Sequence, residues 1–130
     1  MEKKFREDTI LDLLFRAAKN NPSKTYCKSV DHEFTYQQFI SAIIKLSSEI
    51  SSKKLNNEYI GILLPNSILF LISYFAVLNS GNTPALLNFL LPEIALGKLL
   101  DDLQPSLVLS NKELSDYECL TLEIQDYLDI

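Results

Sequence analysis

Few residues in this chain have the type and spacing that chemistry requires. His32 is the one histidine, and Cys27 and Cys119 lie far apart without a CxxC spacing, so neither a nucleophile–base pair nor a metal site can be assembled. We interpret His32 as an exposed turn residue. Asp101 and Asp102 would point about 100° apart on a helix, which indicates surface charge rather than an acid–base pair. We therefore predict no catalytic residue, no cofactor-binding residue and no metal ligand in this chain.

Segments that contain polar side chains nevertheless occur where predicted strands end. They are Pro65-Asn66-Ser67, Asn88-Phe89 and Ser110-Asn111. In open α/β sheets, ligands lie in the crevice beyond the carboxyl ends of the strands. We therefore expect Pro65, Asn66, Ser67, Asn88 and Phe89 to form part of the wall of a substrate cleft. The alternative is that these residues serve only in helix capping and turns.

Apolar blocks predict the elements that position these residues. Short blocks of this kind are typical of strands that are covered on both faces, and longer ones of helices. Ser67 or Asn66 can cap the first helix, and Pro92 fits the first turn of the second. Strands are expected at 60–64, 85–87 and 106–110, and helices at 68–79 and 92–103. This alternation predicts an α/β fold with an open, mainly parallel sheet and helices on both faces.

The N-terminal part predicts further helices and a small β-hairpin. Apolar residues spaced by three and four between Thr9 and Asn20 indicate a helix with one buried face. The weak alternation around Asp31 suggests a hairpin of 25–29 and 33–35. Thr35 and Gln38 match a capping box and predict that the next helix starts there. Residues 1–8 are expected to be flexible.

The composition indicates a single acidic domain over residues 1–130. At 130 residues and 14.8 kDa the chain has the usual size of one domain. A net charge of −5 and a pI near 4.8 argue against nucleic-acid binding, which needs a basic surface. Residues 58–130 carry ten Asp or Glu against two Lys or Arg, so they predict a solvated acidic face or a docking surface for a basic partner. The N-terminus has no signal-peptide pattern, which predicts a cytoplasmic context.

An uncharged run from Tyr59 to Pro92 raises the question of a membrane span. A membrane helix needs about 20 consecutive apolar residues, but Pro65-Asn66-Ser67 interrupts the run and leaves only about half of a span at 68–78. Glu58 and Glu93 flank the run in place of basic anchors. We predict a buried strand, a capped turn and a buried helix, with a membrane-associated protein as the alternative.

The order of segments along the chain resembles the start of a known enzyme family. TILDLLFRAAKNNPSKTY is followed by FTYQQFISAIIKLSSEI, by YIGILLPNSILFLISYFAVLNSGNTPALLN and by LLDDLQPSLVLSNKEL. Together they look like the N-terminal subdomain of the adenylate-forming superfamily of acyl-CoA synthetases, luciferases and peptide-synthetase adenylation domains. The LPNS motif at 64–67 and the G-x-x-P step at Gly81 and Pro84 carry the resemblance, and in the family these positions are chiefly structural.

The resemblance implies a function for a larger parent enzyme. Family members use ATP and Mg²⁺ to convert a carboxylic acid into acyl-AMP and pyrophosphate, and then pass the acyl group to a thiol of CoA or a carrier protein. The family's phosphate loop, adenine-binding segment, ribose-binding Asp and catalytic Lys follow the region matched here, so none of them is carried over. PALLNF at 84–89 is similar to acyl-acyl-carrier-protein synthetase/2-acylglycerophosphoethanolamine acyltransferases, which implies a fatty acid substrate.

We therefore expect a non-catalytic N-terminal part of an ATP-dependent fatty acid ligase, either excised from a longer enzyme or a truncated paralogue. Its expected partners are the rest of the parent enzyme and, for that parent, a fatty acid with CoA or acyl carrier protein. The parent would be cytoplasmic, with peripheral contact to the inner membrane as an option. The alternative is a stand-alone binding or regulatory domain without catalysis. Uncovered apolar surface would favour self-association, with Phe70, Tyr74, Leu90 and Leu91 as candidates.

Overall fold

The structure is a computed structural model that describes residues 9–114 and 116–128. The expectation for residues 1–8 lies outside the described residues. The helices are α2 (Ile10–Asn20), α3 (Tyr36–Ser51), α4 (Ile68–Asn79) and α5 (Glu93–Leu103), followed by the 3-10 helix η1 (Ile124–Tyr127). The strands are β1 (Thr25–Lys28), β2 (Glu33–Thr35), β3 (Tyr59–Leu63), β4 (Thr83–Leu86), β5 (Leu107–Ser110) and β6 (Cys119–Thr121).

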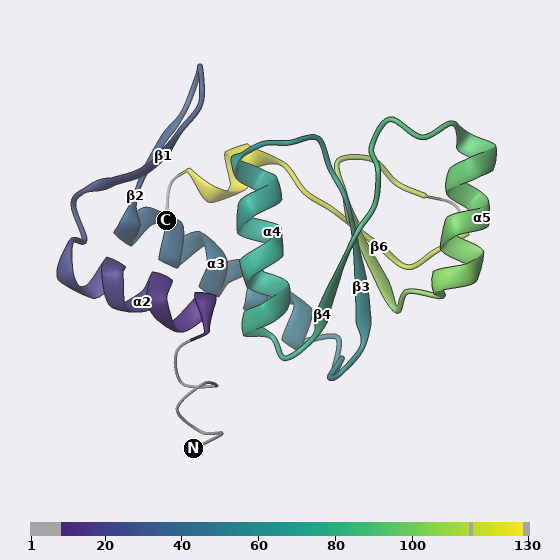
Figure 1. Ribbon diagram of the computed structural model, residues 1–130, viewed down its shortest axis with the longest axis horizontal. Helices are drawn as coiled ribbons and strands as arrows, with labels where there is room; N and C mark the ends of the chain where they lie inside the picture. The colour runs from purple at the N-terminus through teal and green to yellow at the C-terminus, as the bar shows by residue number, and fades with distance from the viewer. Residues whose placement is uncertain (1–8, 115, 129–130) are drawn as a thin grey trace.

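A parallel sheet forms the centre of the fold, with the strand order β4-β3-β5-β6. Figure 1 shows α4 on one side of this sheet and α5 on the other. The buried apolar side chains form two hydrophobic clusters, and successive residues of β3 belong to different ones. Ile62 packs with α3 and α4, whereas Leu63 packs with α5. Side chains of a strand alternate between faces, so each face has its own core. The predicted α/β fold with helices on both faces is confirmed.

Helix α4 accounts for the uncharged stretch of the sequence. It lies against α3 and the sheet, so residues around its circumference are buried, including Ile72, Ala76 and Val77. The buried hydroxyl of Ser47 in α3 donates to Ile43 O of its own helix at 2.7 Å and accepts a hydrogen bond from Asn79 at 3.1 Å, which ties α3 to α4. Among the described residues, no helix is long and apolar enough to cross a membrane.

The N-terminal elements also form as the sequence predicts. β1 and β2 pair in an antiparallel hairpin. Thr35 caps α3 by accepting the Gln38 N–H at 3.2 Å, and Gln38 accepts the Thr35 N–H at 2.9 Å, so both halves of the capping box are present. Phe39, whose side chain is fully buried, anchors the helix to the core through Tyr26 and Phe75.

Strand β4 begins two residues earlier than expected, at Thr83 rather than Ala85, and therefore includes Pro84. Proline is tolerated in a sheet where its missing N–H would face away from the neighbouring strand. Thr83 donates to Glu58 O at 2.9 Å and Leu87 donates to Ile62 O at 3.0 Å. Along β4, the backbone N–H and C=O groups of successive residues point alternately toward β3 and away from it. Thr83 and Leu87 donate toward the β3 side, so the backbone of Pro84 points away from β3, at the edge of the sheet.

Other boundaries differ from the sequence prediction for local reasons. Pro92 is the residue before α5 and not part of its first turn. Helix α5 ends at Leu103 because Gln104 adopts a left-handed conformation, with φ of 51°, before Pro105 is reached. β6 and η1 were not predicted, since three- and four-residue elements carry too little periodicity to be recognised.

Candidate functional site

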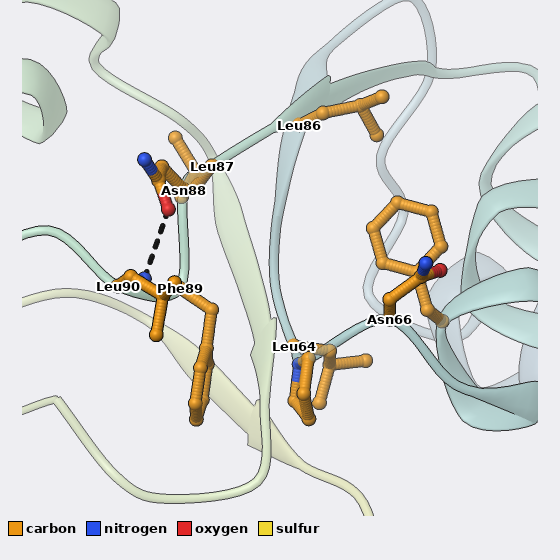
Figure 2. Close-up of a pocket in the computed structure, with 9 residues that line it drawn as sticks. Leu64, Asn66, Leu86, Leu87, Asn88, Phe89 and Leu90 are labelled. Carbon is orange, nitrogen blue, oxygen red and sulfur yellow. Dashed lines mark hydrogen bonds between the residues drawn. The ribbon is translucent and has the colours of Figure 1, made fainter.

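An apolar cavity of about 490 Å³ lies where β3 and β4 end (Figure 2). The residues that line it come from the end of β4, from the chain segments that follow β3 and β4, and from α4. They are Leu64, Pro65, Asn66, Phe70, Leu86, Leu87, Asn88, Phe89 and Leu90. The structure thus brings four of the five expected cleft-wall residues together at one cavity, namely Pro65, Asn66, Asn88 and Phe89. That this cavity holds a substrate stays a prediction.

The topology explains why these segments meet. β3 and β4 are parallel neighbours, so the chain leaves both at the same edge of the sheet. Leu87 continues the ladder by donating to Ile62 O at 3.0 Å, which brings the Asn88 turn beside the end of β3. The Asn88 side chain accepts the Leu90 N–H at 2.9 Å, as the dashed line in Figure 2 shows. Asn88 therefore also stabilises a turn, which was the alternative to a cleft-wall role in the sequence analysis.

The chemistry of the apolar cavity is that of a binding surface. Its lining contains leucine, phenylalanine and proline side chains and two neutral amides, and none of the lining residues is titratable. Such a surface can take up an apolar molecule and offer it amide hydrogen bonds, but it has no group that transfers protons and no charged side chain. A carboxylate on a bound molecule would therefore find no cationic partner within this lining.

Ser67 is the expected cleft-wall residue that does not line the apolar cavity. Its hydroxyl accepts the Phe70 N–H at 3.2 Å and donates to Pro65 O at 3.0 Å, so it caps α4. It borders a second cavity of about 380 Å³, which we call the mixed cavity. This cavity is lined by Ser29, His32, Ser67, Ile68, Leu69, Asn111, Leu122, Glu123 and Ile124. His32 is half-buried and not exposed as expected, because it lies at this cavity together with Ile68 and Leu69 of α4.

Gly81 and Pro84 both lie at positions with a special backbone requirement. Gly81 follows α4 with φ of 81°, donates to Leu78 O at 3.1 Å, and is followed by Asn82, which donates to Val77 O at 3.1 Å. This pair of bonds is the Schellman motif, which favours glycine at the left-handed position. Pro84 lies on the outer edge of β4, where no N–H is needed.

Asn82 is the structural residue that the sequence reasoning missed. Its side chain is only 6% exposed. Its Oδ1 accepts the Glu58 N–H at 2.9 Å, and its Nδ2 donates to Leu55 O at 3.3 Å and to Ser80 Oγ at 3.0 Å. These bonds fix the loop before β3 to the end of α4. A polar residue directly after a helix-ending glycine, within an otherwise apolar run, was the available signal.

The two cysteine thiols are weakly reactive in the folded chain. Burial raises the pKa of Cys27 to about 11 and also raises the pKa of Cys119, so both thiols stay protonated and weakly nucleophilic at neutral pH. Asp101 accepts a hydrogen bond from the Tyr117 hydroxyl, which raises the pKa of Tyr117 to about 12. Asp101 and Asp102 are both exposed, in agreement with the surface role expected for them.

Comparisons with known proteins agree with this architecture. The family model described as AMP-binding enzyme matches residues 14–127. No curated protein sequence matches the chain. Among solved structures, the N-terminal subdomain of NpsA from Klebsiella oxytoca in complex with 3-hydroxybenzoyl-AMSN has a TM-score of 0.77 at 16% identity, over 86% of this chain and 29% of that chain.

Two further solved structures show the same fold. O-succinylbenzoate coenzyme A synthetase (MenE) from Bacillus subtilis, in complex with AMP, has a TM-score of 0.75 at 15% identity, over 90% of this chain and 32% of that chain. An artificially fused adenylation–PCP di-domain, NpsA-ThdA from Klebsiella oxytoca, has a TM-score of 0.77 at 16% identity, over 85% of this chain and 22% of that chain. The chain thus spans a third or less of these proteins. With a family match over most of its length, the chain belongs to the AMP-binding enzyme family.

Proposed function

We propose that this chain is a non-catalytic N-terminal part of an acid–thiol ligase. In the parent enzyme a carboxylate would attack the α-phosphorus of ATP, forming acyl-AMP and releasing pyrophosphate, and a thiol would then displace AMP from the acyl group. The chain would contribute one α/β layer and an apolar wall. The observation that carries this proposal is the apolar cavity, where the segments after β3 and β4 form a binding surface without titratable side chains.

The cavity suits the apolar body of a carboxylic acid. Leu86 is 58% exposed and Phe89 is 38% exposed, so both can be covered by a bound molecule. We favour a fatty acid, and the PALLNF segment supports an acyl-acyl-carrier-protein synthetase linked to phospholipid acylation. The NpsA complexes with 3-hydroxybenzoyl-AMSN and anthranilyl-AMSN make an aryl acid the competing substrate.

The parent enzyme would need ATP with Mg²⁺ and a thiol acceptor. The AMP complex of the coenzyme A synthetase and the adenylation–PCP fusion support CoA and a carrier protein, respectively, as acceptors. We propose a cytoplasmic location, with the parent enzyme in peripheral contact with the inner membrane where its lipid substrates lie.

The rest of the parent enzyme would cover the apolar side chains between Leu86 and Ile94. Leu90 is 85% exposed and Ile94 is 81% exposed, whereas Phe70, Tyr74 and Leu91 are half-buried against the two cores. Of the four side chains expected to be uncovered, Leu90 is therefore the one that is fully available. Without its covering layer, we propose that the chain self-associates through this surface.

Catalysis outside this chain is tested by assaying it directly. The 130-residue protein would be incubated with ATP, Mg²⁺, dodecanoate or 3-hydroxybenzoate, and CoA, and pyrophosphate release would be measured. We expect none above the rate without protein. Pyrophosphate formation that depends on the acid would overturn the assignment of all catalytic residues to other parts of the enzyme.

Binding at the apolar cavity is tested separately by NMR titration with dodecanoate and 3-hydroxybenzoate. We expect dodecanoate to shift the backbone amides of residues 86–90 and the Leu86→Ser variant to weaken its binding. Leu13→Ser is the matched control, because Leu13 on α2 is 51% exposed and lies outside the cavity. Preference for 3-hydroxybenzoate would favour an aryl substrate, and equal effects of the two variants would refute the cavity assignment.

A further inference from the structure

The mixed cavity is built by segments that lie far apart in the sequence. Ser29 and His32 come from the β1–β2 hairpin, Ser67 to Leu69 from the start of α4, Asn111 from the loop after β5, Leu122 and Glu123 from the segment after β6, and Ile124 from the start of η1. The turn after β3 separates it from the apolar cavity, since Leu64 to Asn66 line one cavity and Ser67 to Leu69 line the other.

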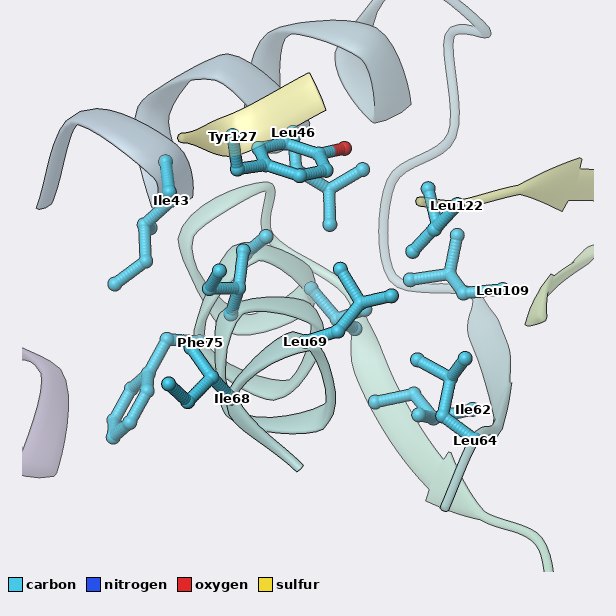
Figure 3. Close-up of a cluster of buried hydrophobic side chains, with 14 of the residues drawn as sticks. Ile43, Leu46, Ile62, Leu64, Ile68, Leu69, Phe75, Leu109, Leu122 and Tyr127 are labelled. Carbon is cyan, nitrogen blue, oxygen red and sulfur yellow. The ribbon is translucent and has the colours of Figure 1, made fainter. Parts of the chain in front are cut away.

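The floor of the mixed cavity is formed by buried apolar side chains. Ile68, Leu69 and Leu122 are all less than a tenth exposed and belong to the larger hydrophobic cluster (Figure 3). Ile124 is half-buried against the same cluster. These side chains are held by the core, so the floor is formed before any ligand arrives. A preformed apolar floor of this kind favours a ligand with an apolar body.

The rim of the cavity carries polar groups of two kinds. The hydroxyls of Ser29 and Ser67 already make hydrogen bonds to the backbone, with His32 and Phe70 among their partners. By contrast, the imidazole of His32, the amide of Asn111 and the carboxylate of Glu123 have no hydrogen-bond partner within residues 9–114 and 116–128. These three side chains can therefore bind a ligand without giving up an existing bond.

The charge of the rim favours a cation. Glu123 is the one Asp or Glu among the lining residues, and no Lys or Arg is among them. The start of α4 also borders the cavity and would favour an electronegative atom, but Ser67 already caps it by accepting the Phe70 N–H. A carboxylate or phosphate on a ligand would face Glu123 without a compensating cation, whereas an ammonium group would pair with it.

We propose that the mixed cavity binds small organic ammonium compounds, with the apolar body on Ile68, Leu69 and Leu122 and the ammonium group at Glu123. The His32 imidazole and the Asn111 amide accept the remaining ammonium hydrogens or bind a hydroxyl of the ligand. This site is independent of the proposed ligase function, because it shares no lining residue with the apolar cavity.

The test compares three probes of similar shape and different charge by NMR titration of the 130-residue chain: 2-phenylethylamine, 2-phenylethanol and 3-phenylpropionate. We expect the amine to bind most tightly and to shift the backbone amides of residues 68–69 and 122–124. Glu123→Gln should weaken amine binding about twofold to fivefold, the range of an exposed charge pair, and leave the alcohol unchanged. Glu118→Gln, an exposed carboxylate outside the cavity, is the matched control.

Several results would overturn the proposal. Tighter binding of 3-phenylpropionate would mean that the start of α4 and not Glu123 sets the charge preference. Equal binding of the amine and the alcohol, or equal losses in Glu123→Gln and Glu118→Gln, would remove the role of Glu123. Shifts confined to residues 86–90, or no shift at all, would show that the mixed cavity is not the binding site.

Discussion

The two faces of the parallel sheet are covered to very different depths. On one face, Ile60, Ile62, Leu107 and Leu109 pack into a large cluster with side chains of α2, α3, α4 and η1. On the other face, Leu63 and Val108 pack with Leu87 and with Leu96 and Leu100 of α5 in a cluster of five buried residues, against which only partly buried side chains pack. The cluster on the first face is large and mostly buried. The cluster on the second face contains fewer buried side chains and is bordered by exposed apolar side chains. Stability is therefore expected to reside on the α3–α4 face, and further contacts to form on the α5 side.

The largest effect should come from a cavity made in the α3–α4 face. Leu46→Ala removes a fully buried side chain surrounded by the large cluster, where neighbours cannot collapse into the space. We expect a loss of about 4 kcal/mol in the free energy of unfolding, measured by urea denaturation. A loss below about 1 kcal/mol would show that this face is loosely packed.

The same deletion on the α5 face should cost less. Leu100 is 3% exposed and packs in the small cluster, so α5 can move inward after Leu100→Ala. We expect a loss of about 2 kcal/mol in the same assay. Equal losses for Leu46→Ala and Leu100→Ala would remove the difference between the two faces.

The helices on the two faces are followed by different residues in the left-handed conformation. Substitutions at these two residues should therefore change the free energy of unfolding in opposite directions. α4 is followed by Gly81 with φ of 81°, whereas α5 is followed by Gln104 with φ of 51°. Gly81→Ala places a side chain in the left-handed region and should cost about 1–2 kcal/mol of unfolding free energy. Gln104→Gly relieves the same strain and should gain about 0.5 kcal/mol, although it loses the Gln104 bond to Asp101 O at 2.8 Å. Thermal unfolding of both variants would show whether the signs are opposite.

The smallest effect concerns the two cysteines, one beside each core. Burial raises the pKa of Cys27 from near 9 to about 11, so the folded state favours the protonated thiol. Its contribution to stability is present below about pH 9 and is lost as the pH rises toward 11. The fall in melting temperature over this window should be smaller in Cys27→Ser. Thiol labelling at pH 8 should modify Cys119 faster than Cys27, and the reverse order would contradict the comparison.

The sequence predicted those parts of the fold that local patterns determine. The capping box at Thr35, the left-handed glycine at Gly81 and the break at Pro65-Asn66-Ser67 each follow from one residue type with one backbone requirement. These signals were enough to place the helices, the hairpin and a parallel sheet. They also placed four of the expected cleft-wall residues at one cavity, because parallel strands end at the same edge.

The features of the fold and of the site that the sequence did not predict depend on contacts between distant segments of the chain. Ser67 borders the mixed cavity because His32 of the hairpin and Leu122 to Ile124 line the same cavity, and no local pattern encodes that these distant segments meet. Asn82 is buried because the loop before β3 closes over it, which depends on the pairing of β3 with β4. β6 is held by its pairing with β5 and not by its own three residues.

The outward position of Pro84 has a consequence for solubility. Strand β4 offers outward-facing backbone only at Pro84 and Leu86, and Pro84 has no N–H to donate. A strand from another molecule could therefore form only an interrupted ladder along this edge, which opposes the open-ended stacking of amyloid fibrils. Molecules that meet through Leu90 and Ile94 should accordingly form small, reversible assemblies held by side chains rather than polymers held by backbone hydrogen bonds.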